Sequence, residues 1–199
     1  MLLALSGFMG CGKSSVASEL ARLWGGFYFD LDRTIEQEEG RSIAEIFAEE
    51  GESGFRIMEY DYLLRIVSDF EDFSSERIVL ALGGGTVLTR QCAGILKENA
   101  KCVYLRASVD TLVSNLIETG IQDRPLLCGE TVGTAVDDGV ADDGATNDKA
   151  LTLKREVERL LSERREVYER TADFIIDTDG LSPKEIAEKI DSIDELLKI

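Results

Sequence analysis

The sequence predicts an α/β protein whose parallel β-sheet is covered by helices on both faces. Short apolar runs alternate with longer stretches of helical periodicity, which is typical of parallel strands joined by right-handed crossovers. The first apolar run, residues 2–5, leads directly into a glycine-rich loop. Ligands of such sheets bind at the carboxyl ends of the strands, so we expect functional residues in the loops that follow strands.

Five apolar runs have the length of buried strands. They are residues 2–5, 27–29, 78–82, 102–105 and 174–176. Capping residues and helical periodicity mark the helices between them. Ser42 and Glu45 form a capping box, and Pro183 follows a capping Ser182 at the start of the last helix. The expected helices span residues 14–24, 42–47, 54–68, 109–118 and 150–171, with the last one beginning at 182.

The segment around residues 119–150 differs from the rest of the chain. Its part from 129 to 148 is rich in acidic residues and glycine and has no aromatic residue, so it has little surface to bury. We expect a mobile lid and an acidic insertion here, within a single domain that spans residues 1–199.

The composition excludes several classes of protein. The formal net charge of −17 opposes binding to nucleic acid. The absence of histidine removes His-based catalytic triads and His general bases. The cysteines form no CxxC pair, so we expect neither zinc nor disulfides. No apolar run approaches the roughly 18 residues of a membrane span. We therefore expect a cytoplasmic protein with no nucleic-acid or membrane partner.

A phosphate-binding loop is the strongest motif. Residues 7–14 have the sequence GFMGCGKS and match GxxxxGK[ST] at every fixed position, between a predicted strand and a predicted helix. This context argues against a glycine-rich turn without a ligand. Lys13 is expected to reach the β and γ phosphates of ATP, and the Ser14 hydroxyl is expected to bind Mg²⁺. The remaining nucleotide-binding candidates of the loop are Gly10, Cys11, Gly12 and Ser15.

Two aspartates follow the second predicted strand. In an extended segment Asp30 and Asp32 would face the same side. One carboxylate would then orient a water of the Mg²⁺ shell while the other accepts the proton of an attacking hydroxyl. The alternative is that Asp32 caps a helix that starts at Arg33, and the two roles are compatible.

Glycines and arginines supply the other candidates. The run Gly83–Gly84–Gly85 ends the third strand and allows close approach to a ligand, or serves only as a flexible turn. Arg56 and Glu59 share one helix face, so the acid would hold the guanidinium for a carboxylate ligand. Arg124 and Arg164 are further candidates. For each of these arginines the alternative is a solvated surface charge.

These motifs, in this order, resemble those of the shikimate kinase family. The resemblance extends from residue 2 to about residue 193, and it includes FDLD, SIAEIF, GESGFRIME, LGGG, RPLL and RREVYERTADFIID after the phosphate loop. It implies a nucleoside-monophosphate-kinase-like fold with five parallel strands in the order 2-3-1-4-5. It also implies phosphorylation of the 3-hydroxyl of shikimate by ATP with Mg²⁺, on the route to chorismate and the aromatic amino acids.

The resemblance implies a role for each substrate-side residue. Asp32 is similar to the aspartate that binds the shikimate hydroxyls near the attacking oxygen, and Asp30 is similar to the water-mediated Mg²⁺ partner. Arg56 and Arg164 resemble the arginines that hold the substrate carboxylate. The run Gly83–Gly84–Gly85 would close the pocket around the substrate.

The nucleotide side matches the family less completely. Arg124 resembles the lid arginine that moves onto the phosphates, and Pro183 is a candidate for contact with adenine. Family members commonly carry two arginines near the adenine, but this chain has Ile117 and Leu181 at about those places. The acidic segment is also longer than the family lid.

Two other functions compete with this interpretation. A gluconate-kinase-like enzyme would share the phosphate loop and an anionic substrate, but is not expected to combine FRxxE with GGG. A nucleotide-binding regulator without catalysis is disfavoured because Lys13, Ser14, Asp32 and Arg124 are all present. We expect a monomer whose partners are ATP and a small-molecule substrate.

Overall fold

A parallel β-sheet of five strands forms the centre of the protein, in the order β2-β3-β1-β4-β5. A computed structural model describes residues 1–70, 77–120, 125–127 and 143–193. The strands are β1 (Leu2–Ser6), β2 (Phe27–Asp30), β3 (Ile78–Ala81), β4 (Lys101–Arg106) and β5 (Phe174–Asp177). The predicted fold class and strand order are therefore confirmed.

The central strands hold the core. Every residue of β1 and β3 is buried, as expected for strands that are covered on both faces. Leu5 pairs with Ala81 on one side and with Val103 on the other. All pairings between neighbouring strands are parallel, so the carboxyl ends of the strands meet at one edge of the sheet.

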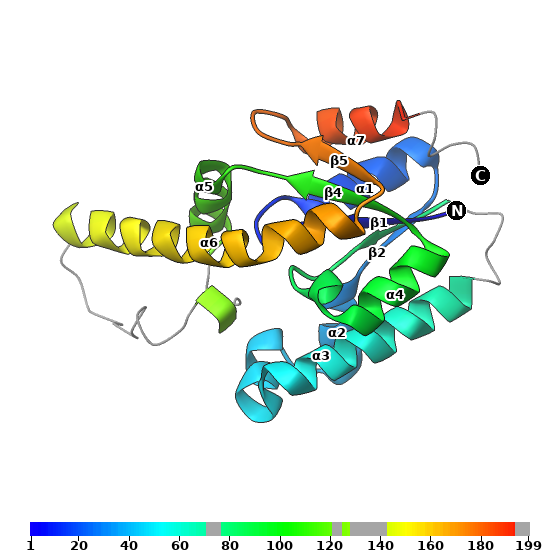
Figure 1. Ribbon diagram of the computed structural model, residues 1–199, viewed down its shortest axis with the longest axis horizontal. Helices are drawn as coiled ribbons and strands as arrows, with labels where there is room; N and C mark the ends of the chain where they lie inside the picture. The colour runs from blue at the N-terminus through cyan, green and yellow to red at the C-terminus, as the bar shows by residue number, and fades with distance from the viewer. Residues whose placement is uncertain (71–76, 121–124, 128–142, 194–199) are drawn as a thin grey trace.

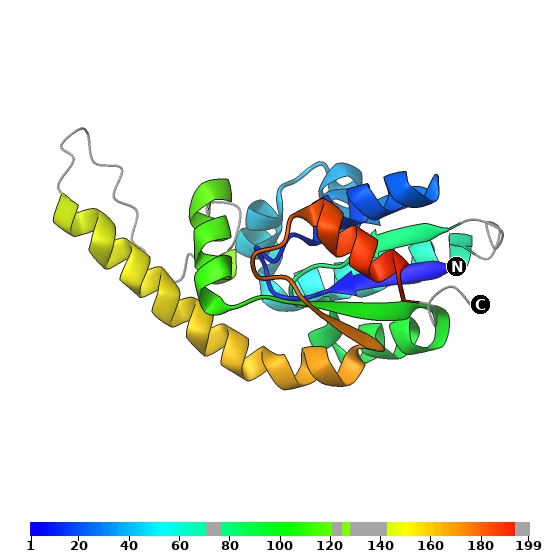
Figure 2. The ribbon, with the colours of Figure 1, turned by 90° about the horizontal axis from the view of Figure 1, so that it is seen from above.

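Helices cover both faces of this sheet (Figure 1). They are α1 (Lys13–Trp24), α2 (Leu31–Glu39), α3 (Ile43–Phe70), α4 (Arg90–Asn99), α5 (Val109–Thr119), α6 (Asp143–Thr171) and α7 (Pro183–Asp191). Two 3-10 turns, η2 (Thr86–Leu88) and η3 (Pro125–Leu127), complete the described elements. Helices α1 and α7 pack together on one face, while α4 and α6 contact β4 from the other (Figure 2).

Helix α4 was not among the expected helices, and helix boundaries differ from the predictions in two further places. The helices expected at 42–47 and 54–68 meet at Gly51, whose φ of 71° and ψ of 177° break the helical backbone of α3. Helix α6 begins at Asp143, so our expectation of a loop up to residue 148 is wrong for its last part. Acidic residues in a first turn are stabilised by the positive end of the helix dipole. The rest of the expected acidic loop, residues 128–142, lies outside the described residues.

The cysteines of the described part lie in the interior. Cys11, Cys92 and Cys102 are buried and free. Burial raises the pKa of the Cys92 and Cys102 thiols to about 11 each, which keeps them in the unreactive thiol form. Within the described residues, no helix is both long and apolar enough to cross a membrane.

Candidate active site

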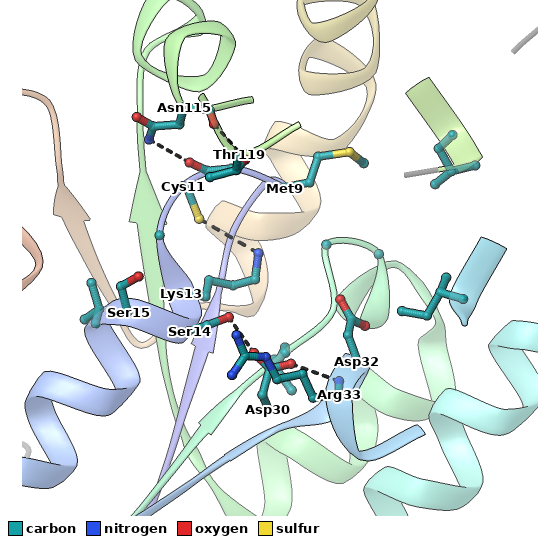
Figure 3. A pocket seen from close by; sticks show the side chains of 18 of the residues that line it. Met9, Cys11, Lys13, Ser14, Ser15, Asp30, Asp32, Arg33, Asn115 and Thr119 are labelled. Atoms are coloured by element: carbon teal, nitrogen blue, oxygen red, sulfur yellow. Dashed lines mark hydrogen bonds between the residues drawn. The ribbon is translucent and has the colours of Figure 1, made fainter. Parts of the chain in front are cut away.

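A cavity of about 840 Å³ opens at the carboxyl edge of the sheet. The phosphate loop, the start of α2, helix α3, the triple-glycine turn (residues 83–85), helix α5 and the loop before α7 all contribute to its wall. Figure 3 shows Lys13 and Asp32 approaching this cavity from α1 and α2. Loops that follow different strands therefore meet at one place, as the sequence predicted.

Glycine is required at several positions of the phosphate loop. Gly7, Gly10 and Gly12 have φ values of 146°, 83° and 87°, which other residues rarely adopt. A Cβ at Gly7 would lie 2.7 Å from the Cys11 sulfur and 2.8 Å from the Leu105 oxygen. Gly12 precedes α1 without a capping side chain, so the free N–H groups of the first turn are available to an anion.

The Lys13 ammonium lies against the phosphate loop. Its Nζ donates hydrogen bonds to the carbonyl oxygens of Gly7 at 2.9 Å and Phe8 at 3.1 Å. The side chain is only 9% exposed. The loop therefore holds a positive charge beside the phosphate-binding N–H groups, and phosphate oxygens are the expected replacements for these carbonyl partners.

Ser14 and Asp30 form the best site for a cation. The Ser14 hydroxyl donates a hydrogen bond to the Asp30 carboxylate. Within the described residues, no cluster of three or more His, Cys, Asp or Glu side chains is present to hold a metal. The pair fits Mg²⁺, which commonly takes few protein ligands and completes its shell with phosphate oxygens and water.

Asp30 also caps helix α2. Its other carboxylate oxygen accepts a hydrogen bond from the Arg33 N–H at 3.2 Å. The alternative in which Asp32 is the capping residue is therefore wrong. Asp30 ends β2 and Asp32 lies in the first turn of α2, so the extended segment expected to align them is absent. Both nevertheless line the cavity.

Asp32 is in an environment that favours its protonated form. Burial is the largest cause, the Glu59 and Asp30 carboxylates add to it, and the Lys13 and Arg56 cations oppose it. Together they raise the pKa of Asp32 to about 7. A carboxyl group with a pKa close to the working pH is suited to accept and release a proton.

The triple-glycine turn allows polar side chains to approach the backbone. A Cβ at Gly83 would lie 2.6 Å from both the Asp32 Oδ1 and the Glu59 Oε1 atoms. A Cβ at Gly85 would overlap the Arg56 guanidinium. Gly84 and Gly85 line the cavity, whereas Gly83 lies behind them against these carboxylates. The turn is thus closely packed, which excludes the alternative of a merely flexible turn.

Arg56 is held by acids on both sides. Its Nη1 pairs with Glu59, which is fully buried, and its Nη2 lies 2.9 Å from Glu52. The Arg56 side chain is 16% exposed and lines the cavity. It is therefore a fixed part of the cavity wall and not a solvated surface charge.

Arg164 is buried with an unused donor. It is 7% exposed, and its guanidinium carbon lies 5.8 Å from the centre of the Phe8 ring. Its Nη1 atom is buried and has no hydrogen-bond partner in the described part of the chain. Burying a charged donor without a partner is costly, so this atom marks a place where an anionic ligand would be stabilised. Arg164 itself is not among the residues of the described cavity wall.

The cavity wall also contains residues that the sequence did not indicate. Asn115 of α5 donates a hydrogen bond to the Gly10 carbonyl oxygen at 2.8 Å, so α5 supports the phosphate loop. Thr111, Thr119 and Thr178 also line the cavity. They follow no fixed spacing, and only the fold brings them to the cavity wall.

Pro183 is the candidate for adenine contact, while Ile117 and Leu181 stand where the family carries arginines, and these three positions differ in their relation to the cavity. Leu181 and Pro183 line the cavity. Ile117 is 57% exposed and does not appear in the described cavity wall. The lid candidate Arg124 lies outside the described residues.

Comparison of this chain with known proteins points to one family. The shikimate kinase family model matches residues 9–194. The shikimate kinase of Thermodesulfovibrio yellowstonii is 35% identical over 188 residues, which cover 94% of this chain and 91% of that protein. The shikimate kinase of Chlorobium phaeobacteroides is 34% identical over 193 residues, with coverage of 95% and 90%.

Solved structures agree with this match. The shikimate kinase of Acinetobacter baumannii in complex with shikimate has a TM-score of 0.80 and 28% identity, and the match covers 100% of this chain and 94% of that one. The enzyme of Bacteroides thetaiotaomicron has a TM-score of 0.75 and 27% identity, with coverage of 100% and 99%. The chain therefore belongs to the shikimate kinase family, small-molecule kinases that use ATP and Mg²⁺.

Proposed function

We propose that this chain transfers the γ-phosphoryl group of ATP to the 3-hydroxyl of shikimate by means of the cavity residues described above. The observation that carries this assignment is the buried Nη1 atom of Arg164, which has no hydrogen-bond partner among the described residues. Arg56 contacts Gly85 of the triple-glycine turn, and Tyr168, one helical turn after Arg164, donates a hydrogen bond to Gly84. Arg56 and the residue one helical turn after Arg164 thus contact neighbouring glycines of this turn, an arrangement that would suit a carboxylate bound between the two arginines.

The phosphate loop is assigned to the nucleotide. Backbone N–H groups of residues 10–15 would bind the phosphates at the start of α1. Lys13 would offset the charge that develops on the transferred phosphoryl group. Ser14 would hold Mg²⁺ directly and Asp30 would hold it through water; when bound, this ion neutralises phosphate charge.

Asp32 is assigned as the group that accepts the proton of the attacking hydroxyl. Its pKa of about 7 lets it take up and release a proton near neutral pH. The carboxylate contacts with Arg56 and Arg164 would place the 3-hydroxyl beside Asp32. By family resemblance, Arg124 would bring a further positive charge onto the phosphates when the lid closes, and Pro183 would contact the adenine.

The remaining assignments concern the whole molecule. We propose a single domain over residues 1–199 that works as a cytoplasmic monomer, with ATP and shikimate as partners and without nucleic acid or membrane partners. Its formal net charge of −17 supports the exclusion of nucleic acid. Lys13 and Arg56 of the cavity wall, together with Arg164 and Arg124, would then form a local cationic site that attracts anionic substrates despite the overall charge.

Coupled measurement of ADP release tests the proposed function. The purified protein is supplied with Mg²⁺ and ATP, together with shikimate, gluconate or no acceptor, and the product is identified by mass spectrometry. We expect rapid ADP release only in the reaction that contains shikimate as the acceptor, and we expect its product to be a shikimate monophosphate. Equal or faster release with gluconate, or release that needs no acceptor, would rule it out.

A further inference from the structure

A buried polar chain links the triple-glycine turn to the proposed substrate arginine. Thr86 and Glu59 are both fully buried. The Thr86 hydroxyl donates a hydrogen bond of 2.6 Å to Glu59 Oε1, and the Glu59 Oε2 atom pairs with Arg56. Among the described residues, these are the two hydrogen-bond partners of the Glu59 carboxylate. This series of hydrogen bonds runs from Thr86 in η2 to Glu59 and Arg56 in α3, and so reaches the cavity wall.

Each link in this chain constrains the next. A buried carboxylate needs partners for both oxygens, and here one partner is a neutral hydroxyl and the other is the guanidinium. Arg56 has a second acidic neighbour in Glu52, but the Glu52 side chain is 52% exposed. An exposed ion pair contributes little and is easily rearranged. The buried Glu59 is therefore the contact that sets the position of Arg56.

The position of the Thr86 hydroxyl is itself fixed by the backbone. Thr86 begins η2 directly after the triple-glycine turn, and its N–H donates to the Gly83 carbonyl oxygen at 3.3 Å. A Cβ at Gly83 would lie 2.9 Å from the Thr86 Oγ1 atom, so glycine there leaves room for the hydroxyl. The turn thus presents a single donor to Glu59.

We propose that Thr86 is a positioning residue, whose hydroxyl holds Glu59 in the orientation that places Arg56 at the wall of the substrate cavity. This inference rests on the proposed role of Arg56 as a carboxylate-binding residue. It adds a residue that touches neither substrate nor nucleotide but sets the affinity for the substrate.

The test replaces the hydroxyl while keeping the shape of the side chain. Thr86→Val removes the donor and leaves a buried carboxylate oxygen without a partner. We expect the KM for shikimate to rise about fivefold to tenfold, while the KM for ATP changes by less than about twofold, because a binding interaction is lost on one side of the cavity only. Thr86→Ser retains the hydroxyl and should restore the KM for shikimate to within about twofold of wild type.

A matched control separates positioning from general damage. Within the described residues, the Thr171 hydroxyl bonds only to carbonyl oxygens of its own helix, those of Val167 and Tyr168. Thr171→Val should therefore leave both KM values unchanged. A purely structural role for Thr86 would lower the fraction of folded enzyme and hence the apparent kcat. It would leave the KM for shikimate unchanged, because KM does not depend on the concentration of active enzyme.

A double-mutant cycle distinguishes failure of this inference from failure of the function on which it rests. Arg56→Ala alone must raise the KM for shikimate, and Thr86→Val must add little in the Arg56→Ala background. If Arg56→Ala leaves the KM unchanged, the role of Arg56 fails. If Arg56→Ala raises it but Thr86→Val does not, or if Thr86→Ser fails to restore it, only the role of Thr86 is overturned.

Discussion

The Tyr168 hydroxyl donates a hydrogen bond to the Gly84 carbonyl oxygen, although the two residues are 84 positions apart in the sequence. Tyr168 is fully buried, and its ring stacks on that of Tyr104 with 5.1 Å between the ring centres. Burial raises the pKa of the Tyr168 hydroxyl, so this group remains a donor at neutral pH. The bond joins the helix that carries Arg164 to the triple-glycine turn.

Tyr168→Phe should weaken the binding of shikimate without affecting ATP. The variant keeps the stacked ring and removes only the hydroxyl, which leaves the Gly84 carbonyl oxygen without this partner. We expect a loss of about 1 kcal/mol in the free energy of unfolding and a rise of roughly threefold to tenfold in the KM for shikimate. Tyr62→Phe is the control, because the Tyr62 hydroxyl bonds to Glu39, which is not among the cavity residues. Equal changes in both KM values for Tyr168→Phe would contradict this account.

Gly85→Ala tests the close packing of the triple-glycine turn. The φ of Gly85 is −119°, so alanine causes no backbone strain there, but its Cβ would overlap the Arg56 guanidinium. We expect Arg56 to move and kcat/KM for shikimate to fall by at least about tenfold, since positioning of the substrate contributes strongly to rate. Gly94→Ala in α4 is the matched control, because a Cβ there meets nothing within 4 Å. Similar kinetics for both variants would show that the turn does not constrain Arg56.

Asp32→Asn should stabilise the protein while impairing catalysis. The pKa of Asp32 is raised in the folded state from 3.8 to about 7, so wild type loses stability as the pH rises through this range. Asparagine does not titrate, so the free energy of unfolding of Asp32→Asn should increasingly exceed that of wild type as the pH rises from 4 to 7. Above pH 7 the difference should be at least about 1 kcal/mol. Turnover should fall by about 100-fold or more if Asp32 accepts the hydroxyl proton.

Denaturant unfolding at pH 5 and pH 8 measures this effect on stability. The exposed Asp61, replaced by Asn, serves as the control and should show the same stability relative to wild type at both pH values. If the free energy of unfolding of Asp32→Asn differs from that of wild type by the same amount at pH 5 and pH 8, the pKa of the Asp32 carboxyl group is not raised in the folded protein.

Much of the architecture was predictable because local signals agree with the global fold. The phosphate loop, the strand runs and the helix cap at Ser182 each depend on a few adjacent residues, and the structure contains them all. Helix α4 was missed because its sequence carries few apolar residues. The start of α6 was missed because the acidic, glycine-rich composition of this segment was interpreted as a loop, whereas the helix begins at Asp143.

The site was predictable only where residues lie close together in the sequence. Arg56 and Glu59 are on adjacent turns of one helix, so their pairing follows from spacing. The contacts of Thr86 with Glu59 and of Tyr168 with Gly84 join distant segments, and no local pattern indicates them. The raised pKa of Asp32 likewise depends on burial and on neighbours that only the folded chain brings together.

Steady-state kinetics of Arg56→Ala and Arg164→Ala, with shikimate and ATP varied in turn, test the central claim most directly. Arg164 has a buried donor without a partner in the part of the chain that the structure describes. Loss of one partner from a desolvated guanidinium–carboxylate pair costs on the order of 2–5 kcal/mol. The account predicts a rise in the KM for shikimate of at least about 30-fold for each variant, with the KM for ATP nearly unchanged. The exposed Arg90, replaced by Ala, should change neither constant. A KM for shikimate that stays at the wild-type value in either variant, or one that rises in parallel with the KM for ATP, would contradict the claim that these arginines hold the substrate carboxylate.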